Sequence, residues 1–227
     1  MRLRKIVEKI GMAALSVPKT AYVNFKYLPF KTAIRFPICV AYHVRIEEFD
    51  RTDIRIDADQ VKIGMIRFGL SKGSFYKGGK SLLHLNGGQI RFKGKAAVCG
   101  GFAIVVDHGK IEIGDHFFSN ANLLLNCSNG IEIGDQVLLG WNCSLLDGNG
   151  HEVISGTSKI KGERGKRISV GSHVWLAAES VMLNGSSVSD GSIVSYGSVV
   201  HGEFKQKHSL IAGNPAKAVK ENIDWKE

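Results

Sequence analysis

The stretch from Ser169 to Gly202, SVGSHVWLAAESVMLNGSSVSDGSIVSYGSVVHG, repeats its residue pattern at a fixed interval. An apolar side chain stands at every sixth position, at Val170, Leu176, Met182, Val188, Val194 and Val200. A small or β-branched residue follows four positions after each of the first five, at Val174, Ser180, Ser186, Ser192 and Ser198. An α-helix has a period of about 3.6 residues and a hairpin strand a period of about two, so neither explains this repeat.

The same repeat extends toward the N-terminus in sets of three residues. The earlier sets are Phe92, Val98 and Ile104, then Ile113, Ser119 and Leu125, then Ile133, Leu139 and Leu145. The first residues of successive 18-residue units are 21, 20, 37 and 18 residues apart, which leaves insertions of 3, 2, 19 and 0 residues. We therefore predict that three short strands form one triangular turn of a coil, with the apolar residues stacked inside from turn to turn.

Composition and charge restrict the class of protein. With 227 residues, 44% of them hydrophobic, the chain can bury one core and reads as one domain with a small appendage. The net charge is +9, and residues 1–35 contribute +7 of it, from eight Lys or Arg against Glu8 alone. The nearly neutral remainder argues against a nucleic-acid surface on the main body. The basic segment allows an acidic small molecule or an anionic membrane surface as a partner near the N-terminus.

The N-terminal segment has its own pattern. Apolar residues recur at helical spacing at Leu3, Ile6, Val7, Ile10 and Ala14, with Arg2, Arg4, Lys5 and Lys9 among them. This predicts a short basic amphipathic helix, which either packs its apolar side on the body or contacts a membrane surface. Pro18, Pro29 and Pro37 predict an extended connection after it. Residues 1–53 then form the helix and lead-in, 54–210 the repeats with a loop at about 150–168, and 211–227 a tail.

The cysteines and the hydropathy indicate the compartment. Cys39, Cys99, Cys127 and Cys143 form no C-x-x-C pair, and three of them lie among small and apolar residues of the repeats. Small buried thiols in a reducing compartment are the expected state. No run of about 18 apolar residues is present, so no segment is expected to span a membrane. The sequence predicts a cytoplasmic protein, with a peripheral position at the inner face of the membrane as the alternative for its basic N-terminus.

Three features together resemble a known family. They are the hexapeptide units, the late IAGNPAKAVK at 211–220, and a His at the end of GWNCSLLDGNGH at 140–151. The chain resembles the hexapeptide acyltransferases over roughly residues 54–222 and is most similar to the sugar and polysaccharide O-acetyltransferases. YVNFKYLPFKTAIRFPI at 22–38 resembles the lead-in of the capsular-polysaccharide branch. The resemblance implies a left-handed parallel β-helix, although most parallel crossovers are right-handed. It also implies a homotrimer with active sites between subunits, acetyl-CoA as donor, a saccharide acceptor and no metal ion.

The 19-residue insertion at about 150–168 is the candidate catalytic loop, because repeat folds place function on excursions from a rigid frame. His151 lies at its start, and the resemblance implies that it is the general base. A neutral imidazole can take a proton from an attacking hydroxyl at neutral pH and return one to the leaving thiolate. Asp147 either orients this imidazole, contacts the acceptor, or serves only the turn. Asn142 or Asn149 is the candidate donor to the oxyanion. The related branch often shows D-x-D-x-H at this place, and Asn149 replaces its second acid.

The resemblance also implies the residues that bind acetyl-CoA. They are Trp175, Ala178, Tyr196, His201, Lys217 and Lys220. The two lysines can meet phosphates as point charges, with an ordinary solvated tail as the alternative. Trp175 points outward by the repeat and could instead serve subunit packing. His201 departs from the family pattern, because many relatives carry Thr-Lys where this chain has His201 and Gly202.

Three other functions compete with O-acetyl transfer. N-acyl transfer to an amino sugar would use the same base and groove. A non-catalytic β-helix scaffold is disfavoured because the His loop and the AGNPAK tail are both present. A zinc-dependent γ-type carbonic anhydrase needs three His around one metal ion. His116 and His151 could supply two of them, but the third has no candidate, since position 156 is Gly156.

Overall fold

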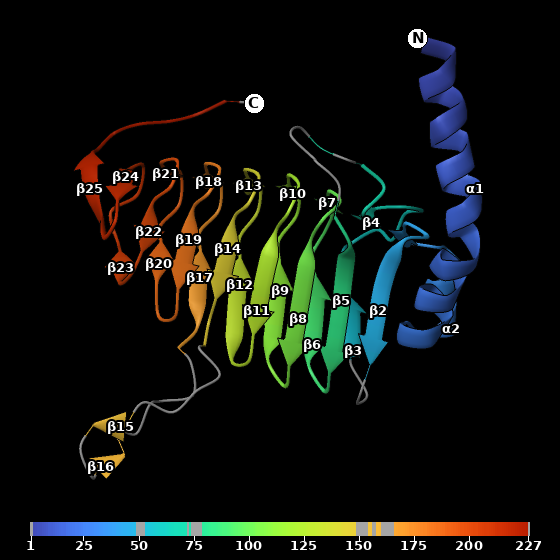
Figure 1. Cartoon of the computed structure of the whole chain (residues 1–227), viewed down its shortest axis with the longest axis horizontal. Helices are drawn as coiled ribbons and strands as arrows, with labels where there is room; N and C mark the ends of the chain where they lie inside the picture. Colours follow the sequence, from blue (N-terminus) through green and yellow to red (C-terminus); the bar gives the residue numbers. More distant parts are fainter. Residues whose placement is uncertain are drawn as a thin grey trace.

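The computed structural model describes residues 2–48, 53–71, 73, 79–148, 154–155, 158–159 and 166–226. For residues 2–10, 154–155 and 158–159 it describes the backbone alone. Two helices, α1 (Arg2–Tyr27) and α2 (Phe30–Ala33), precede the strands. Figure 1 shows the strands wound into a stack of coils, with α1 at one end and β25 (Ala216–Lys220) at the other.

Three sheets form the walls of the coil stack. Sheet A contains β1 (Ile38–Val40), β4 (Ile66–Phe68), β7 (Ala96–Val98), β10 (Phe117–Ser119), β13 (Leu138–Leu139), β18 (Trp175–Leu176), β21 (Ile193–Val194), β24 (Leu210–Gly213) and β25. Sheet B contains β2 (Val44–Glu48), β5 (Ser81–Asn86), β8 (Ala103–Asp107), β11 (Leu124–Cys127), β14 (Ser144–Leu146), β19 (Val181–Leu183) and β22 (Val199–Val200). Sheet C contains β3 (Asp53–Ile56), β6 (Gln89–Phe92), β9 (Lys110–Ile113), β12 (Gly130–Ile133), β17 (Ile168–Val170), β20 (Ser187–Val188) and β23 (Glu203–Phe204).

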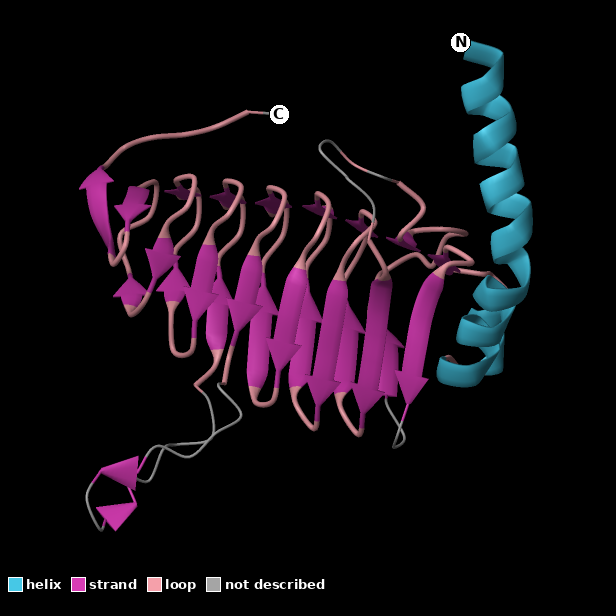
Figure 2. Ribbon diagram, in the orientation of Figure 1, coloured by secondary structure: helices cyan, strands magenta, loops and turns pink. Residues whose placement is uncertain are grey.

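The chain visits sheets A, B and C in turn, and each visit pairs in parallel with the strand of the coil before it. This is the predicted left-handed parallel β-helix, and the fold prediction is confirmed. The antiparallel pairing of β25 with β24 ends sheet A. A separate two-stranded antiparallel hairpin, β15 (Ile154–Ser155) and β16 (Ser158–Lys159), lies outside the three sheets (Figure 2).

The six-residue repeat specifies the interior. In sheet C, Phe92 pairs with Ile113, Ile113 with Ile133, and Ile133 with Val170. Every repeat residue named above is at most 3% exposed, including the apolar residues of sheets A and B. The serines four positions later are buried as well, at Ser180, Ser186, Ser192 and Ser198. The insertions of 3, 2, 19 and 0 residues fall at coil corners, so the register of the stack is the predicted one.

The N-terminal helix differs from the prediction in length and orientation. Helix α1 continues through Pro18 to Tyr27, where an extended connection was expected. Pro18 removes one intrahelical donor, but Pro18 and Ala14 are both exposed, so water can hydrate the freed carbonyl group. The helix also does not pack an apolar side on the body. It presents a stripe of Ser16, Thr20 and Asn24 to strand β1.

This polar stripe completes the open edge of sheet A. Tyr42 N–H donates to Ser16 Oγ at 3.0 Å, and Val40 N–H donates to Thr20 Oγ1 at 3.0 Å. The Asn24 amide donates to the Ile38 carbonyl at 2.7 Å and accepts from Ile38 N–H at 3.2 Å. Side chains four residues apart on one helix face therefore replace the neighbouring strand that β1 lacks. The first strands of all three sheets begin before residue 54, at Ile38, Val44 and Asp53, while the proposed domain boundaries stay a prediction.

Candidate active site

The 19-residue insertion leaves the coil between β14 and β17, where sheet B turns into sheet C. His151, the predicted general base, and Asn149 lie outside the described residues. Their roles therefore stay predictions. The described residues on either side fix the corner from which the loop leaves, and Asp147 is the last buried residue before it.

Asp147 is held by the preceding coil. Its carboxylate accepts hydrogen bonds from the N–H groups of Ser128 at 2.8 Å, Asn129 at 2.8 Å and Gly130 at 2.6 Å. The Ser128 hydroxyl adds a fourth at 3.2 Å, and the Asp147 side chain is fully buried. These bonds satisfy the turn donors of the coil below. Asp147 thus fixes the root of the loop through its described contacts, and contact with His151 or an acceptor stays a prediction.

Asn142 lies at a different corner, where sheet A turns into sheet B. It has a left-handed backbone with φ of 58°, as do Asn122 at 64° and Glu179 at 62° in the neighbouring coils. The Asn142 amide donates to Glu179 Oε1 at 2.5 Å, and its oxygen accepts from Asn122 Nδ2 at 2.9 Å. These contacts form a ladder along the corner. The predicted donation from Asn142 to an oxyanion would have to replace the bond to Glu179.

Trp175, Ala178 and Tyr196 gather at this same A/B corner. Trp175 lies on the outer face of sheet A, in β18, and is half-buried. Tyr196 is 66% exposed and lies 18 residues after Ala178, at the equivalent position of the next coil. Gly197 N–H donates to the Ala178 carbonyl at 3.0 Å, which joins the two positions. The coils approach closely here, because a Cβ at Gly140 would lie 2.4 Å from the Ala178 nitrogen.

The structure separates the other predicted donor-binding residues. Lys217 and Lys220 are exposed on β25, at the end of sheet A next to this corner. His201 is exposed after β22, where sheet B turns into sheet C. It therefore shares a corner with Asp147 and the catalytic loop, and not with Trp175 and Tyr196. Within one chain, the donor-binding candidates and the catalytic loop occupy two different corners of the triangular coil.

The sequence did not point to Trp225, which packs beside the candidate donor site. Its ring stacks on His173 with centroids 4.6 Å apart and lies 6.2 Å from the ring of Trp175. The Trp225 indole N–H donates to the His173 carbonyl at 2.9 Å, and Asp224 Oδ1 lies 3.0 Å from His173 Nε2. The C-terminal tail therefore runs back across the coils (Figure 1). The available signal was an apolar Ile223 and Trp225 in an otherwise polar tail.

The four thiols lack the properties of nucleophiles. Burial raises the pKa of Cys143 to about 12 and also raises the pKa of Cys39, Cys99 and Cys127. A protonated, buried thiol is a poor nucleophile at neutral pH. The expected buried state is confirmed for Cys99, Cys127 and Cys143, and Cys39 is partly exposed.

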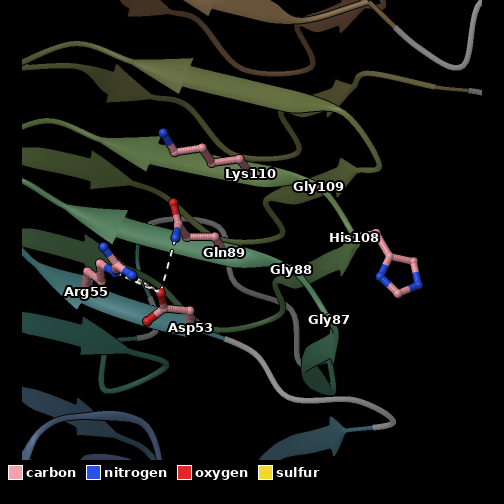
Figure 3. Close-up of a pocket in the computed structure, with 8 residues that line it drawn as sticks. All are labelled: Asp53, Arg55, Gly87, Gly88, Gln89, His108, Gly109 and Lys110. Atoms are coloured by element: carbon pink, nitrogen blue, oxygen red, sulfur yellow. Dashed lines mark hydrogen bonds and ion pairs between the residues drawn. The ribbon is translucent and has the colours of Figure 1, made fainter.

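A polar hollow of about 480 Å³ lies on the same B/C side as the catalytic loop, several coils closer to the N-terminus (Figure 3). Asp53 accepts hydrogen bonds there from Arg55 at 2.7 Å and from Gln89 at 3.2 Å. His108 points away from this cluster in Figure 3. The Arg55 charge is therefore matched locally. Among the residues that the structure describes, no group of three His, Cys, Asp or Glu could hold a metal ion.

Comparison with known proteins supplies the family. No protein-family model matches the chain. It is 26% identical to an uncharacterized 24.8 kDa protein in the cps region of Klebsiella pneumoniae, over 99% of both chains. It is 30% identical to the galactoside O-acetyltransferase of Escherichia coli (strain K12), over 50% of this chain and 55% of that one, so that match spans about half of each.

The crystal structure of the polySia-specific acetyltransferase NeuO shares the fold, with a TM-score of 0.52 at 21% identity. The superposition covers 82% of this chain and 89% of that one. The six-residue coils, the interrupted corner and these relatives agree with the family that the sequence resembles. The chain belongs to the hexapeptide-repeat acyltransferase family.

Proposed function

We propose that the protein transfers an acetyl group from acetyl-CoA to a hydroxyl of a saccharide or polysaccharide precursor. The observation that carries this proposal is the interrupted coil, whose long loop leaves beside the buried Asp147 while the neighbouring coils stay in register. The acceptor class is supported by the relatives, one of which is a galactoside O-acetyltransferase.

The proposed reaction needs one base and no covalent intermediate on the enzyme. Neutral His151 takes the proton of the acceptor hydroxyl as its oxygen attacks the thioester carbonyl carbon. The resulting tetrahedral oxyanion is stabilised by hydrogen-bond donors, and collapse breaks the carbon–sulfur bond. The imidazolium then returns its proton to the CoA thiolate. This direct transfer accords with the high pKa of the buried cysteines.

The separation of the candidate residues onto two corners supports a homotrimer. Donor-binding candidates lie at the A/B corner, and the catalytic loop leaves from the B/C corner. If three coil stacks pack around an axis parallel to them, the B/C corner of one subunit can face the A/B corner of the next. Each active site then lies between subunits. A peripheral position at a membrane stays a prediction for where this activity takes place.

Replacing the base tests the proposal. His151→Ala should leave acetyl-CoA affinity and melting temperature near wild type, because the imidazole acts on a proton and holds neither substrate. Acetyl transfer should fall by roughly 10²–10⁴-fold. The wild-type rate should also fall below a pH of about 6.5, where imidazole becomes protonated, and the variant should lose this dependence. The assay presents a panel of saccharides with acetyl-CoA and detects the products by mass.

His116→Asn is the matched control. His116 is an exposed histidine at another corner, with φ of 55°, and Asn tolerates that backbone conformation. Its transfer rate should match wild type. A His151→Ala variant that keeps more than about a third of the wild-type rate would exclude the mechanism. An acetylated amine among the products, with no acetylated hydroxyl, would move the assignment to N-acyl transfer.

A further inference from the structure

The face of α1 that points away from the coils is apolar. Because Ser16, Thr20 and Asn24 supply the contacts with β1, the larger apolar residues remain in solvent. Steps of three and four residues place these side chains on one side of the helix. Helix α2 extends the same surface, since the rings of Phe25 and Phe30 are 6.2 Å apart. We call this surface the apolar face, and its exposed members are Leu15, Pro18, Tyr22, Phe25, Phe30 and Ile34.

This exposure is large for side chains of this kind. Phe30 is 72% exposed and Leu15 is 61% exposed. Single exposed apolar residues need no explanation, but a contiguous apolar surface on two adjoining helices indicates a binding site. Some of its rings contact one another, since Phe25 also meets Phe36 edge-on at 5.8 Å. The apolar face is therefore a built surface that the intrachain contacts do not cover.

The charges around the apolar face are predominantly positive. Lys26, Lys31 and Arg35 are exposed beside the aromatic residues. Lys26 lies 3.7 Å from Glu48, which also accepts a hydrogen bond from the Tyr22 hydroxyl at 2.9 Å. Toward the N-terminus, the backbone of α1 carries four basic residues against Glu8: Arg2, Arg4, Lys5 and Lys9. An anionic partner is therefore complementary to this end of the molecule.

We propose that the apolar face docks α1 and α2 on the surface of an anionic lipid membrane. Aromatic and aliphatic side chains would enter the boundary between headgroups and acyl chains, while lysines and arginines meet the lipid phosphates. No helix in the described part of the chain is long and apolar enough to cross a membrane. The helices would thus lie in the plane of the interface. The docking is independent of acetyl transfer.

Two other occupants fit the charges less well. A second copy placed on the same surface by a two-fold axis would bring two strongly basic segments together, and like charges oppose such an interface. A nucleic acid would match the charge, but its interfaces are polar and would leave aliphatic Leu15 and Ile34 without suitable partners. A lipid surface satisfies the apolar and the basic side chains at once.

The position of α1 gives the docking a defined geometry. The helix lies across the end of the coil stack (Figure 1), so a membrane beneath it would leave the coils standing away from the bilayer. In the proposed trimer, with three parallel stacks, all three apolar faces would lie at the same end. Three linked weak contacts then bind one membrane far more tightly than one contact does. This last step rests on the trimer.

Vesicle flotation tests the surface. The full-length protein is mixed with vesicles of phosphatidylcholine alone or of phosphatidylcholine with phosphatidylglycerol, at low and high salt. The wild type should float with the anionic vesicles at low salt and be released as salt rises. The double variant Phe25→Ser with Phe30→Ser should bind at least about tenfold more weakly, since two aromatic side chains no longer leave water. Lys31→Gln with Arg35→Gln should lose about tenfold at low salt.

The matched controls lie at the far end of the molecule. Val219→Ser removes an exposed apolar residue from β25, and Lys205→Gln removes an exposed charge. Both should float like wild type. Circular dichroism establishes that each variant is folded. Wild-type protein that ignores anionic vesicles, or a Phe25→Ser/Phe30→Ser variant that floats normally, overturns the proposal. A change in the oligomer of that variant in sedimentation velocity, without vesicle binding by wild type, assigns the face to a second copy.

Discussion

The two ends of the coil stack solve the same problem in different ways. Each end exposes the edge of a sheet whose backbone groups need partners. At the N-terminal end, side chains of a helix bind the edge of β1, through Ser16, Thr20 and Asn24. At the C-terminal end, strand β25 pairs antiparallel with β24, and the tail then folds back so that Trp225 stacks on His173. One cap is made by side chains and the other mainly by backbone.

The difference determines what each end leaves exposed. A helix that spends its polar stripe on the sheet has its apolar residues left over, and they form the apolar face. A strand that pairs through its backbone leaves its side chains free, which exposes Lys217 and Lys220 near the candidate donor site. The N-terminal cap thus offers a surface for docking, and the C-terminal cap offers charges for a phosphate-bearing ligand.

The largest effect is expected from a charge inside the last coils. Val194 is fully buried, and its neighbours in the stack are Leu176 and Ile211. Val194→Asp would bury an unpaired carboxylate, at a cost of several kcal/mol against a total stability of roughly 5–15 kcal/mol. Since coils stabilise only their neighbours, protection in hydrogen exchange should be lost from the C-terminal coils first. Coils next to α1 should keep it.

Tyr196→Asp is the control for that charge. Tyr196 lies two residues away and is exposed, so the variant should melt within a few degrees of wild type. Equal melting temperatures for wild type and Val194→Asp would refute the inward stacking. Loss of protection along the whole stack at once would refute the independence of the two ends.

A smaller effect is expected from Asn24, the buried residue of the N-terminal cap. Asn24→Leu keeps the approximate size but leaves the buried N–H and carbonyl groups of Ile38 without their partner. Each unsatisfied group costs about 1–3 kcal/mol. Thermal unfolding should therefore begin at lower temperature, and the Ile38 amide should exchange faster. The exposed neighbour Phe25→Ser should change stability by no more than about 0.5 kcal/mol. Equal stability of the two variants would show that the polar stripe does not hold the cap.

The sequence predicts the interior of this fold well because the repeat is a packing rule. Phe92 and Ile113, 21 residues apart, are neighbours in sheet C because both start an 18-residue unit. The spacing alone gives the register, including the coils on either side of the 19-residue insertion, where Ile133 pairs with Val170. Only a stacked coil makes residues with this period meet, so local pattern and tertiary contact carry the same information.

The caps and the candidate site are less predictable, since their contacts have no period. Pro18 suggested a break, but it lies on the exposed side of α1, where a proline costs the helix less. The partners of Ser16, Thr20 and Asn24 lie 14–26 residues away and are backbone groups, which leave no mark in the sequence. Asp147 could be read as a turn or a catalytic residue, and its bonds to Ser128–Gly130 support the turn. Its part in catalysis stays a prediction, as does that of His151.

The smallest effect is expected at the C-terminal cap, where one exposed carboxylate helps to hold the tail. The Trp225 N–H donates to Asp224 and His173 lies against it, so the pKa of Asp224 falls below its ordinary value of 3.8. A lowered folded-state pKa means that this contribution is complete above pH 3.8 and is lost as pH falls through the lower folded value. Acid should therefore release the tail and expose Trp225, with a red shift of its emission between about pH 5 and about pH 3. The Trp225→Phe variant gives the emission of the remaining tryptophans, and circular dichroism shows whether the coils stay folded. Asp224→Asn removes the titrating group and should abolish the shift. An acid shift that persists in Asp224→Asn while the coils remain folded would show that another group holds the tail.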